Sequence, residues 1–311
     1  MDALKRAGIR VVTPAFADLE HTVREELARA LSVCQTNNLK LILHEVGGYA
    51  IKALHEHFAE ACETVIGAIE VTKQGVWAAQ SLPELRIPQV NCAQTRLKEI
   101  EGKMVGEAVV SSLDNILRDM GYAVVGRAAL VNGYGWVGKA TANSLRQRGL
   151  RVSVNDCDII KCVEATVDGF AVVRQPSDIE SPAIVIGASG RESISAQVID
   201  NLPDRCFIVS GASKNHEADL DHLASLTVRT RPIHRHVDAH TLKDGRTLLL
   251  VNKGYPVNFT GSSVPDEIVE FLFAELIMLV PALLDHDLEP GIYPLKDEHE
   301  QIAAQIWLDL R

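Results

Sequence analysis

Short apolar runs and longer helical patterns alternate along this chain. A run such as Leu39 to Leu43 has the length of a buried strand, whereas apolar residues spaced three and four apart indicate a helix. In the first hundred residues the expected strands are 9–12, 39–43, 64–69 and 88–92, and the expected helices are 18–34, 50–61 and 76–81. Such alternation predicts a parallel sheet with helices on its faces.

The alternation resumes after a long helical pattern, Leu97 to Met120, which ends at Gly121. In this middle part the expected strands are 128–131, 150–154, 171–173, 183–186 and 206–209, and the expected helices are 137–148 and 159–167. The runs 237–242 and 246–251 then flank Asp244-Gly245 and predict an antiparallel hairpin. Two further helices are expected at 265–284 and 297–310.

A glycine pattern follows the first strand of the middle part. The segment Gly133-Tyr134-Gly135-Trp136-Val137-Gly138 lies between a predicted strand and a predicted helix, which is the context of a dinucleotide-binding fingerprint. Gly133 permits the turn, Gly135 lets a pyrophosphate approach the backbone, and Gly138 lets the helix pack on the strand. We expect all six residues to bind the cofactor, with its pyrophosphate facing the N–H groups of the new helix.

An acidic residue and a second glycine turn complete this cofactor site. Asp156 follows the next strand, where a carboxylate accepts the ribose hydroxyls of NAD and repels the 2'-phosphate of NADP. Ala188, Ser189 and Gly190 follow the strand 183–186, and we expect them to line the nicotinamide end. The sequence therefore predicts NAD as the cofactor and an α/β fold with a Rossmann-type doubly wound parallel sheet.

The composition of the chain argues against nucleic acid, membranes and metal ions as binding partners. With 311 residues and a net charge of -10, the chain suits two domains and offers no basic field for nucleic acid. It has no apolar run as long as a membrane span and no secretory signal, so we expect a cytoplasmic protein that does not bind membranes. Its six cysteines lack C-x-x-C spacing, and His234, His236 and His240 have no carboxylate or Cys to complete a ligand set. We expect no metal.

Several segments of the chain resemble the S-adenosylhomocysteine hydrolase family. They are 7–9, 41–48, 69–75, 88–91, 133–139, 242–246 and 254–258, so the similarity extends over nearly the whole chain. The resemblance implies a Rossmann domain, 104–262, inserted into a second, smaller, discontinuous α/β domain formed by 1–103 and 263–311. It also implies that tightly held NAD oxidises a ribose 3'-hydroxyl, that a group is then eliminated, and that the cofactor is restored.

The resemblance carries three cofactor residues over to this chain. Asp156 matches the family's ribose-binding acid, Asn258 matches an Asn on the nicotinamide side, and Thr72 falls in a Thr-rich cofactor turn. Other positions depart from the family. Its catalytic Lys falls at Arg96, and a guanidinium is not a base at neutral pH because it stays protonated. The family's N-terminal adenosine-holding segment has no counterpart, so we expect NAD binding to be kept and S-adenosylhomocysteine hydrolysis to be lost.

Four residues are candidates for catalysis on a small-molecule substrate. Glu45 matches an acid of the family and ends a predicted strand, where it would act as a general base or lie on the surface of a turn. Lys73 would transfer protons if it were buried, or be solvated. Arg96 would grip an anion or form an interdomain ion pair. The family's catalytic His falls at Asn215 or His216, depending on a one-residue gap, and a histidine at this place would exchange protons with the substrate.

Three functions are compatible with these features. The leading hypothesis is a NAD-dependent oxidoreductase, or an oxidation-assisted lyase or hydrolase, for a small hydroxylated or nucleoside-like substrate other than S-adenosylhomocysteine. A non-catalytic NAD-binding sensor or scaffold is the alternative from a different class. A 2-hydroxyacid-type dehydrogenase would require Arg96 and His216 to meet at the nicotinamide. The apolar helix 265–284 predicts a homo-oligomer.

Overall fold

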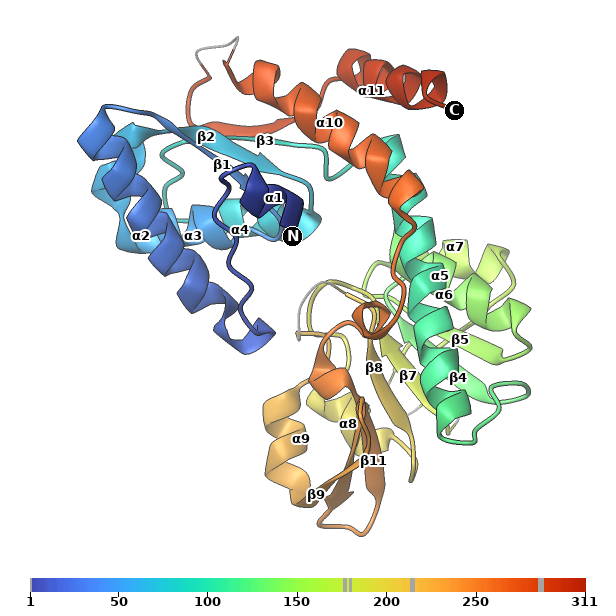
Figure 1. Cartoon of the computed structure of the whole chain (residues 1–311). Coiled ribbons are helices and arrows are strands. Elements are labelled where there is room, and N and C mark those ends of the chain that lie inside the picture. The colour runs from blue at the N-terminus through green and yellow to red at the C-terminus, as the bar shows by residue number, and fades with distance from the viewer. Residues whose placement is uncertain (1, 176–177, 179–180, 213–215, 285–287) are drawn as a thin grey trace. The chain divides into compact units, whose positions relative to one another are not determined.

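The computed structural model describes residues 2–175, 178, 181–212, 216–284 and 288–311 (Figure 1). The chain forms two compact units: unit 1 comprises Met1–Thr95 with Phe271–Arg311, and unit 2 comprises Arg96–Glu270. The first break falls where α5 (Arg96–Asp119) begins, because this helix is uninterrupted and belongs wholly to unit 2. The expected boundary between residues 103 and 104 lies inside it.

Unit 1 is built on a four-stranded parallel sheet in the order β1-β2-β3-β12. The strands are β1 (Leu41–Glu45), β2 (Val65–Glu70), β3 (Pro88–Asn91) and β12 (Gly291–Pro294). The helices are α1 (Asp2–Arg6), η1 (Phe16–Asp18), α2 (Leu19–Asn37), α3 (Tyr49–His57), η2 (Ala59–Thr64), α4 (Lys73–Gln80), α10 (Asp266–Leu284, which begins in unit 2) and α11 (Asp297–Asp309).

Helices from both ends of the chain cover the unit 1 sheet. Leu31 of α2 and Leu54 of α3 pack in one apolar cluster with Leu43 of β1. Leu276 and Leu279 of α10 pack in another with residues of β2 and β3. The C-terminal segment therefore buries apolar surface of strands near the N-terminus, which is why unit 1 is discontinuous in sequence.

Unit 2 contains an eight-stranded sheet in the order β6-β5-β4-β7-β8-β11-β10-β9. The first six strands in this order are parallel, and β10 and β9 are antiparallel additions at one edge. The strands are β4 (Ala128–Asn132), β5 (Arg151–Asn155), β6 (Ala171–Val172), β7 (Ile184–Gly187), β8 (Phe207–Ser210), β9 (Thr227–His234), β10 (Val237–Leu242) and β11 (Thr247–Val251). The remaining helices are α6 (Trp136–Gln147), α7 (Ile159–Val167), α8 (Ala196–Asn201), α9 (Leu220–Leu226), η4 (Asn252–Gly254) and η5 (Val257–Thr260). This arrangement confirms the expected α/β class and Rossmann-type sheet.

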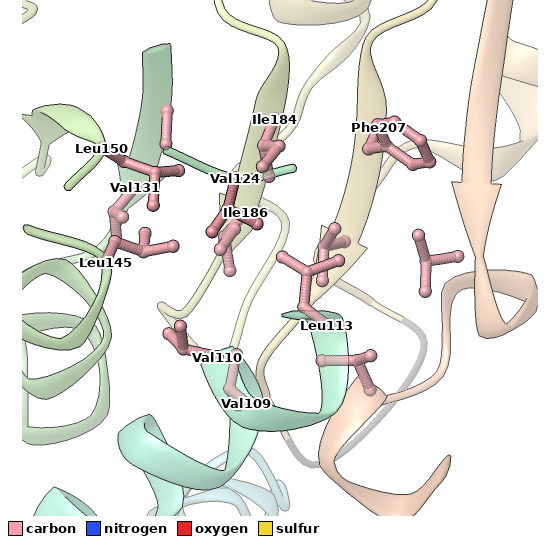
Figure 2. Packing of buried hydrophobic residues seen from close by; sticks show 14 of the residues in the cluster. Val109, Val110, Leu113, Val124, Val131, Leu145, Leu150, Ile184, Ile186 and Phe207 are labelled. Atoms are coloured by element: carbon pink, nitrogen blue, oxygen red, sulfur yellow. The ribbon is translucent and has the colours of Figure 1, made fainter. Parts of the chain in front are cut away.

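Alternate residues of the unit 2 strands enter two different apolar clusters. Figure 2 shows Val109, Val110 and Leu113 of α5 with Ile184 and Ile186 of β7. Val185, between those two isoleucines, packs instead with Val198 and Ile199 of α8 on the other face. Because successive side chains of a strand point to opposite faces, the continuous apolar runs of the sequence become a sheet buried on both sides.

The structure corrects three expectations about strands. Residues 9–12 form no strand, and Ile9 and Val12 are exposed. β9 was not expected because its residues are mostly exposed and include Pro232, so no apolar alternation marks it; it forms by pairing with β10 at the sheet edge. β12 was missed because a short half-buried strand is recognisable only from its pairing with β3.

Helices α5 and α6 approach closely enough for one glycine to be required. A Cβ on Gly106 would lie 2.5 Å from Ala140 Cβ and 2.7 Å from the backbone of α6, whereas a Cβ on Gly102 would lie 3.1 Å from Trp136 Cβ. We expect Gly106→Ala to lower the free energy of unfolding by about 1–3 kcal/mol, because overpacking outweighs the better helix propensity of Ala. Gly102→Ala, in the same helix, should change it by less than about 1 kcal/mol. Denaturant unfolding of both variants measures this, and equal effects would contradict the packing argument.

Candidate cofactor site

The turns after β4 and β7 meet at one edge of the unit 2 sheet. These strands are neighbours in the middle of the sheet, and the chain continues to β5 on one side and to β8 on the other. Such a reversal of strand order leaves a crevice at the carboxyl ends of the strands, where doubly wound folds bind their ligands. The two turns expected to hold NAD are therefore brought together by the sheet topology.

Close backbone contacts explain two of the three glycines. Gly133 has a φ of 102°, and a Cβ there would lie 2.8 Å from the backbone of Ala188 and Ser189. A Cβ on Gly138 would lie 1.9 Å from the carbonyl oxygen of Gly133. A Cβ on Gly135 would meet nothing within 4 Å. Gly133 and Gly138 are thus required by packing, whereas Gly135 leaves open space at the N-terminus of α6.

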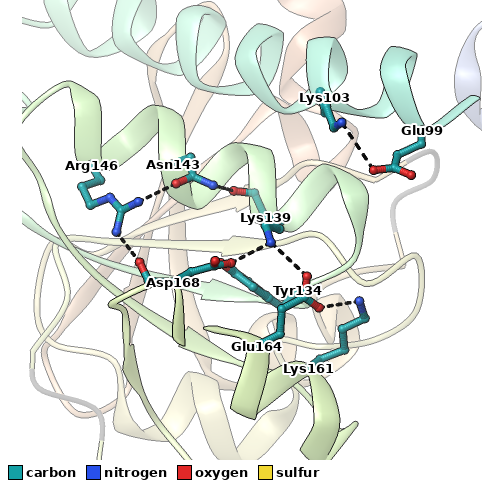
Figure 3. Close-up of polar contacts among 9 residues, drawn as sticks. All are labelled: Glu99, Lys103, Tyr134, Lys139, Asn143, Arg146, Lys161, Glu164 and Asp168. Atoms are coloured by element: carbon teal, nitrogen blue, oxygen red, sulfur yellow. Dashed lines mark hydrogen bonds and ion pairs between the residues drawn. The ribbon is translucent and has the colours of Figure 1, made fainter. Parts of the chain in front are cut away.

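The side chain of Tyr134 lies inside unit 2, where it holds the glycine turn in place. Its side chain is fully buried, and its hydroxyl donates to Asp168 Oδ2 at 2.8 Å (Figure 3). Lys139 Nζ lies 2.7 Å from the same Asp168 oxygen and 2.9 Å from Glu164 Oε1. Burial, with the hydrogen bond to Asp168, raises the pKa of the Tyr134 hydroxyl. The Tyr134 side chain is therefore engaged within unit 2, and a role of this residue in cofactor binding stays a prediction.

The carboxylate of Asp156 joins the end of β5 to the glycine turn. Its Oδ2 accepts from the Tyr134 N–H at 2.6 Å, and its Oδ1 accepts from the Asp158 N–H at 2.8 Å. The group is half-buried, and each carboxylate oxygen has a second lone pair for another donor. These bonds hold the carboxylate beside the turn, where it can accept the hydroxyls of a ribose.

The turn after β7 is held by a buried residue that sequence reasoning missed. Glu217 is 1 % exposed and accepts from the Gly190 N–H at 2.6 Å, from Ser189 Oγ at 3.0 Å and from Ser193 Oγ at 2.5 Å. Burial raises the pKa of Glu217, and these hydrogen bonds oppose the rise. No sequence signal marked Glu217, because its partners lie 24 to 28 residues away along the chain.

Asn258 lies at the same edge of the sheet. The preceding Pro256 bridges to Ser210 at the carboxyl end of β8. The Asn258 side chain is 4 % exposed, and its Nδ2 donates to Ser263 Oγ at 3.1 Å. Within the described residues its Oδ1 is buried and has no hydrogen-bond partner. A buried amide oxygen of this kind needs a donor, and the carboxamide of nicotinamide would supply one.

These residues fit a dinucleotide. The first N–H groups of α6 have no acceptor within the helix and favour an anion, and no side chain at Gly135 blocks the approach of a pyrophosphate. Asp156 is the candidate for binding a ribose, and Asn258 is the candidate for binding an amide. Trp136 and Val137 begin α6 and contribute its first N–H groups.

In unit 1, Glu45 and Glu70 end adjacent strands and hold the following loops. Glu45 accepts from the N–H groups of Ala50 and Ile51 at the start of α3. Glu70 is fully buried, and its oxygens accept from the N–H groups of Gly47 and Gly48 and from other groups of its own turn. Burial raises the pKa of Glu70. Both carboxylates therefore stabilise backbone at the carboxyl edge of the unit 1 sheet.

The other predicted site residues are placed as follows. The hydroxyl of Thr72 donates to Glu70 Oε1 at 2.7 Å and accepts from the Gly75 N–H at 3.0 Å, so it caps α4. Lys73 and Arg96 are exposed first residues of α4 and α5, in unit 1 and unit 2 respectively. His216 is an exposed turn residue beside Glu217. Asn215, the alternative position for the family's catalytic His, lies outside the described residues.

No group of His, Cys, Asp and Glu side chains in the described part of the chain could hold a metal ion. The ring Nδ1 of His240 lies within hydrogen-bond distance of Thr227 and Thr230, and His234 Nε2 lies 3.9 Å from Asp119. Among the described helices, none is long and apolar enough to cross a membrane.

The fold and these turns define a Rossmann-type NAD-binding protein. Residues 107–264 match the model of the NAD-binding domain of S-adenosyl-L-homocysteine hydrolase, which confirms NAD as the cofactor. The chain is 30 % identical over 315 residues to adenosylhomocysteinase of Thermotoga maritima, covering 99 % of this chain and 76 % of the relative. The protein therefore belongs to the S-adenosyl-L-homocysteine hydrolase family, as its resemblance implied.

Other relatives are less completely covered. S-inosyl-L-homocysteine hydrolase of Methanothermobacter thermautotrophicus is 28 % identical, over 86 % of this chain and 66 % of that protein. Adenosylhomocysteinase of Saccharolobus solfataricus is 29 % identical, over 82 % of this chain and 62 % of that protein. Among solved structures, phosphoglycerate oxidoreductase of Vibrio cholerae matches with a TM-score of 0.45 and 10 % identity over 69 % of this chain and 70 % of that chain. That likeness is too low to add to the family assignment.

Alanine at two of the glycines should separate stability from cofactor binding. Gly135→Ala places its Cβ in open space, so we expect unchanged stability and NAD affinity weakened by about tenfold or more, about 1.4 kcal/mol. Gly138→Ala forces its Cβ against the Gly133 carbonyl and should lower the free energy of unfolding by about 1–3 kcal/mol. Thermal unfolding and NAD titration measure the two effects. If Gly135→Ala binds NAD as tightly as the wild type, the pyrophosphate does not approach the backbone at residue 135.

The buried Glu217 should make stability depend on pH. Its pKa is raised above the usual 4.5 in the folded protein, so its contribution is fully present below pH 4.5 and is lost as the pH rises through the folded value. We expect the free energy of unfolding of the wild type, relative to Glu217→Gln, to fall as the pH rises above 4.5. Denaturant unfolding across this range tests it, with the exposed Glu192→Gln as control. If the stability of the wild type relative to Glu217→Gln rises with pH instead, the pKa of Glu217 is not raised in the folded protein.

Proposed function

We propose that this protein is an NAD-dependent enzyme that oxidises a hydroxyl of a small hydroxylated or nucleoside-like substrate, with elimination or hydrolysis following the oxidation. The observation that carries the proposal is the cofactor edge of unit 2. There the open backbone at Gly135, the fixed carboxylate of Asp156 and the buried Asn258 oxygen, which has no partner among the described residues, together suit NAD. When bound, NAD supplies the hydride acceptor. Relatives named adenosylhomocysteinase and S-inosyl-L-homocysteine hydrolase support a nucleoside-like substrate class.

The proposed substrate is not S-adenosylhomocysteine. By resemblance, Arg96 occupies the place of the family's catalytic Lys, and a guanidinium does not accept a proton at neutral pH. It would instead bind an anionic group of the substrate. The exposed Lys73 and His216 are the proposed proton carriers, and Glu45, whose oxygens accept from α3, would orient the loop that bears the substrate.

A second candidate function is a non-catalytic NAD-binding sensor or scaffold. The replacement of the family's Lys by Arg96 favours it directly, since such a protein needs the cofactor edge without a base. The two functions differ in one measurable property. An enzyme converts its bound NAD to NADH when it is offered its substrate, whereas a sensor binds the nucleotide without changing its redox state.

The state of the bound cofactor is the first test. The protein is purified without added nucleotide and denatured, and the released NAD and NADH are separated and quantified. We expect NAD near one per chain with a reduced fraction, and an increase in that fraction on incubation with nucleosides or nucleoside thioethers. S-adenosylhomocysteine should give no homocysteine. NAD that never changes redox state with any alcohol would favour the sensor, and production of homocysteine would reject the proposed substrate difference.

Asp156 should set the preference for NAD over NADP. We expect Asp156→Asn to weaken NAD binding and to raise the ratio of NADP to NAD affinity about tenfold, about 1.4 kcal/mol, because the carboxylate no longer repels a 2'-phosphate. Asp158→Asn is the control, since Asp158 caps α7 through the Ile160 N–H and ends the same loop. Fluorescence titration with both nucleotides gives the ratio. An unchanged ratio would show that Asp156 serves only to hold the glycine turn.

Exposed apolar side chains support the proposed homo-oligomer. On α10, Phe273 is 57 % and Ile277 is 68 % exposed, although the same helix buries Leu276 and Leu279 in unit 1. Apolar residues on both faces of a helix are typical of one that packs against a second chain.

A further inference from the structure

Unit 2 contains a cavity at the edge of its sheet opposite the cofactor turns. The cavity has a volume of 570 Å³, within the range of about 300–1,000 Å³ that small-molecule sites occupy. Its lining includes Arg205, which precedes β8, and Thr247, which begins β11. These are the amino ends of two parallel strands, whereas the cofactor turns follow the carboxyl ends of β4 and β7. The cavity is therefore separate from the NAD site.

Paired residues of β9, β10 and β11 line one side of the cavity, in two sets of three. Thr241 of β10 pairs with Arg229 of β9 and Thr247 of β11, and all three line the cavity. Ala239 of β10 pairs in the same way with Arg231 of β9 and Leu249 of β11. Because residues two apart on a strand share a face, the register aligns two guanidinium groups, two hydroxyls and an apolar strip on one surface.

The charge of this cavity is opposite to that of the chain. Three arginines and His234 line it with a single carboxylate, Asp119, in a protein of net charge -10. His234 Nε2 lies 3.9 Å from Asp119, and Arg205 donates to the Tyr122 hydroxyl. Within the residues that the structure describes, the guanidinium groups of Arg229 and Arg231 have neither an ion pair nor a side-chain hydrogen bond.

We propose that this cavity binds the phosphate group of a small molecule. A guanidinium fork matches the geometry of phosphate oxygens, and the hydroxyls of Thr241 and Thr247 are additional donors. Arg205 adopts a left-handed backbone conformation, φ 61°, which is unfavourable for a side chain of this kind and which brings a third guanidinium to the lining. The partly exposed Met120 and Ile233, which also line the cavity, would contact the organic part of a phosphate ester.

Binding is tested on the NAD-loaded protein, so that the cofactor site is filled. Calorimetric titration uses inorganic phosphate and phenyl phosphate as probes. We expect saturable binding with a Kd of about 1 mM or below. Tighter binding of phenyl phosphate would assign the site to organic phosphates, and equal affinity would assign it to free phosphate. Failure of both probes to saturate the protein would overturn the proposal.

Arginine variants tie the binding to the cavity. We expect Arg229→Gln/Arg231→Gln to weaken phenyl phosphate binding at least about tenfold with unchanged NAD affinity, which also reports a folded unit 2. The matched control is Arg235→Gln, because Arg235 is exposed in the turn between β9 and β10 and does not line the cavity. If the double variant and Arg235→Gln weaken phenyl phosphate binding equally, the binding reflects general charge attraction, and the proposal is overturned. The proposal is also overturned if the double variant binds phenyl phosphate normally, even when its oligomeric state changes.

Discussion

The cofactor edge depends on the contact between the glycine turn and the backbone that surrounds it. Gly138 packs against the carbonyl of Gly133, and Gly133 packs against the backbone of Ala188 and Ser189. Only residues without a Cβ allow these approaches, so the turns after β4 and β7 can meet at the reversal of strand order. The open N-terminus of α6, which suits a pyrophosphate, results from this contact.

Carboxylates hold the loops around this edge and around the corresponding edge of unit 1. Asp156 binds the glycine turn, Glu217 binds the turn after β7, and Glu70 binds the loop after β1. Each accepts N–H groups that would otherwise be unsatisfied near the end of a buried strand. Glu70 and Glu217 are buried and have raised pKa values, so the conformations of the loops that they bind are coupled to the ionisation of these two acids.

The two edges of the unit 2 sheet have different chemistry. At the carboxyl ends of the strands, glycine backbone and one helix N-terminus suit an anion that is part of a dinucleotide. At the amino ends, side chains of β9, β10 and β11 provide arginines and threonines. The difference arises because β9 and β10 extend the parallel sheet by antiparallel pairing and add a surface that the dinucleotide-binding strands lack.

The sequence by itself determined the elements with a strong local pattern and the identity of the cofactor, NAD. The run Ala128 to Val131 and the spacing of Gly133, Gly135 and Gly138 identified the fingerprint because these constraints act within one strand-turn-helix unit, and Asp156 follows the next strand along the chain. The catalytic candidates were not decided in this way, since the partners of a side chain depend on distant segments.

Only the tertiary structure decided which polar residues hold loops and which are exposed. Glu45 and Thr72 are predicted site residues, and the structure shows that they accept N–H groups at the starts of α3 and α4. Glu217 carried no sequence signal and binds the turn after β7. β9 likewise has no apolar period, and it exists because β10 offers an edge with which to pair. In each case the interaction is a hydrogen bond to a backbone group that only folding brings near. Such contacts produce no periodic pattern in the sequence.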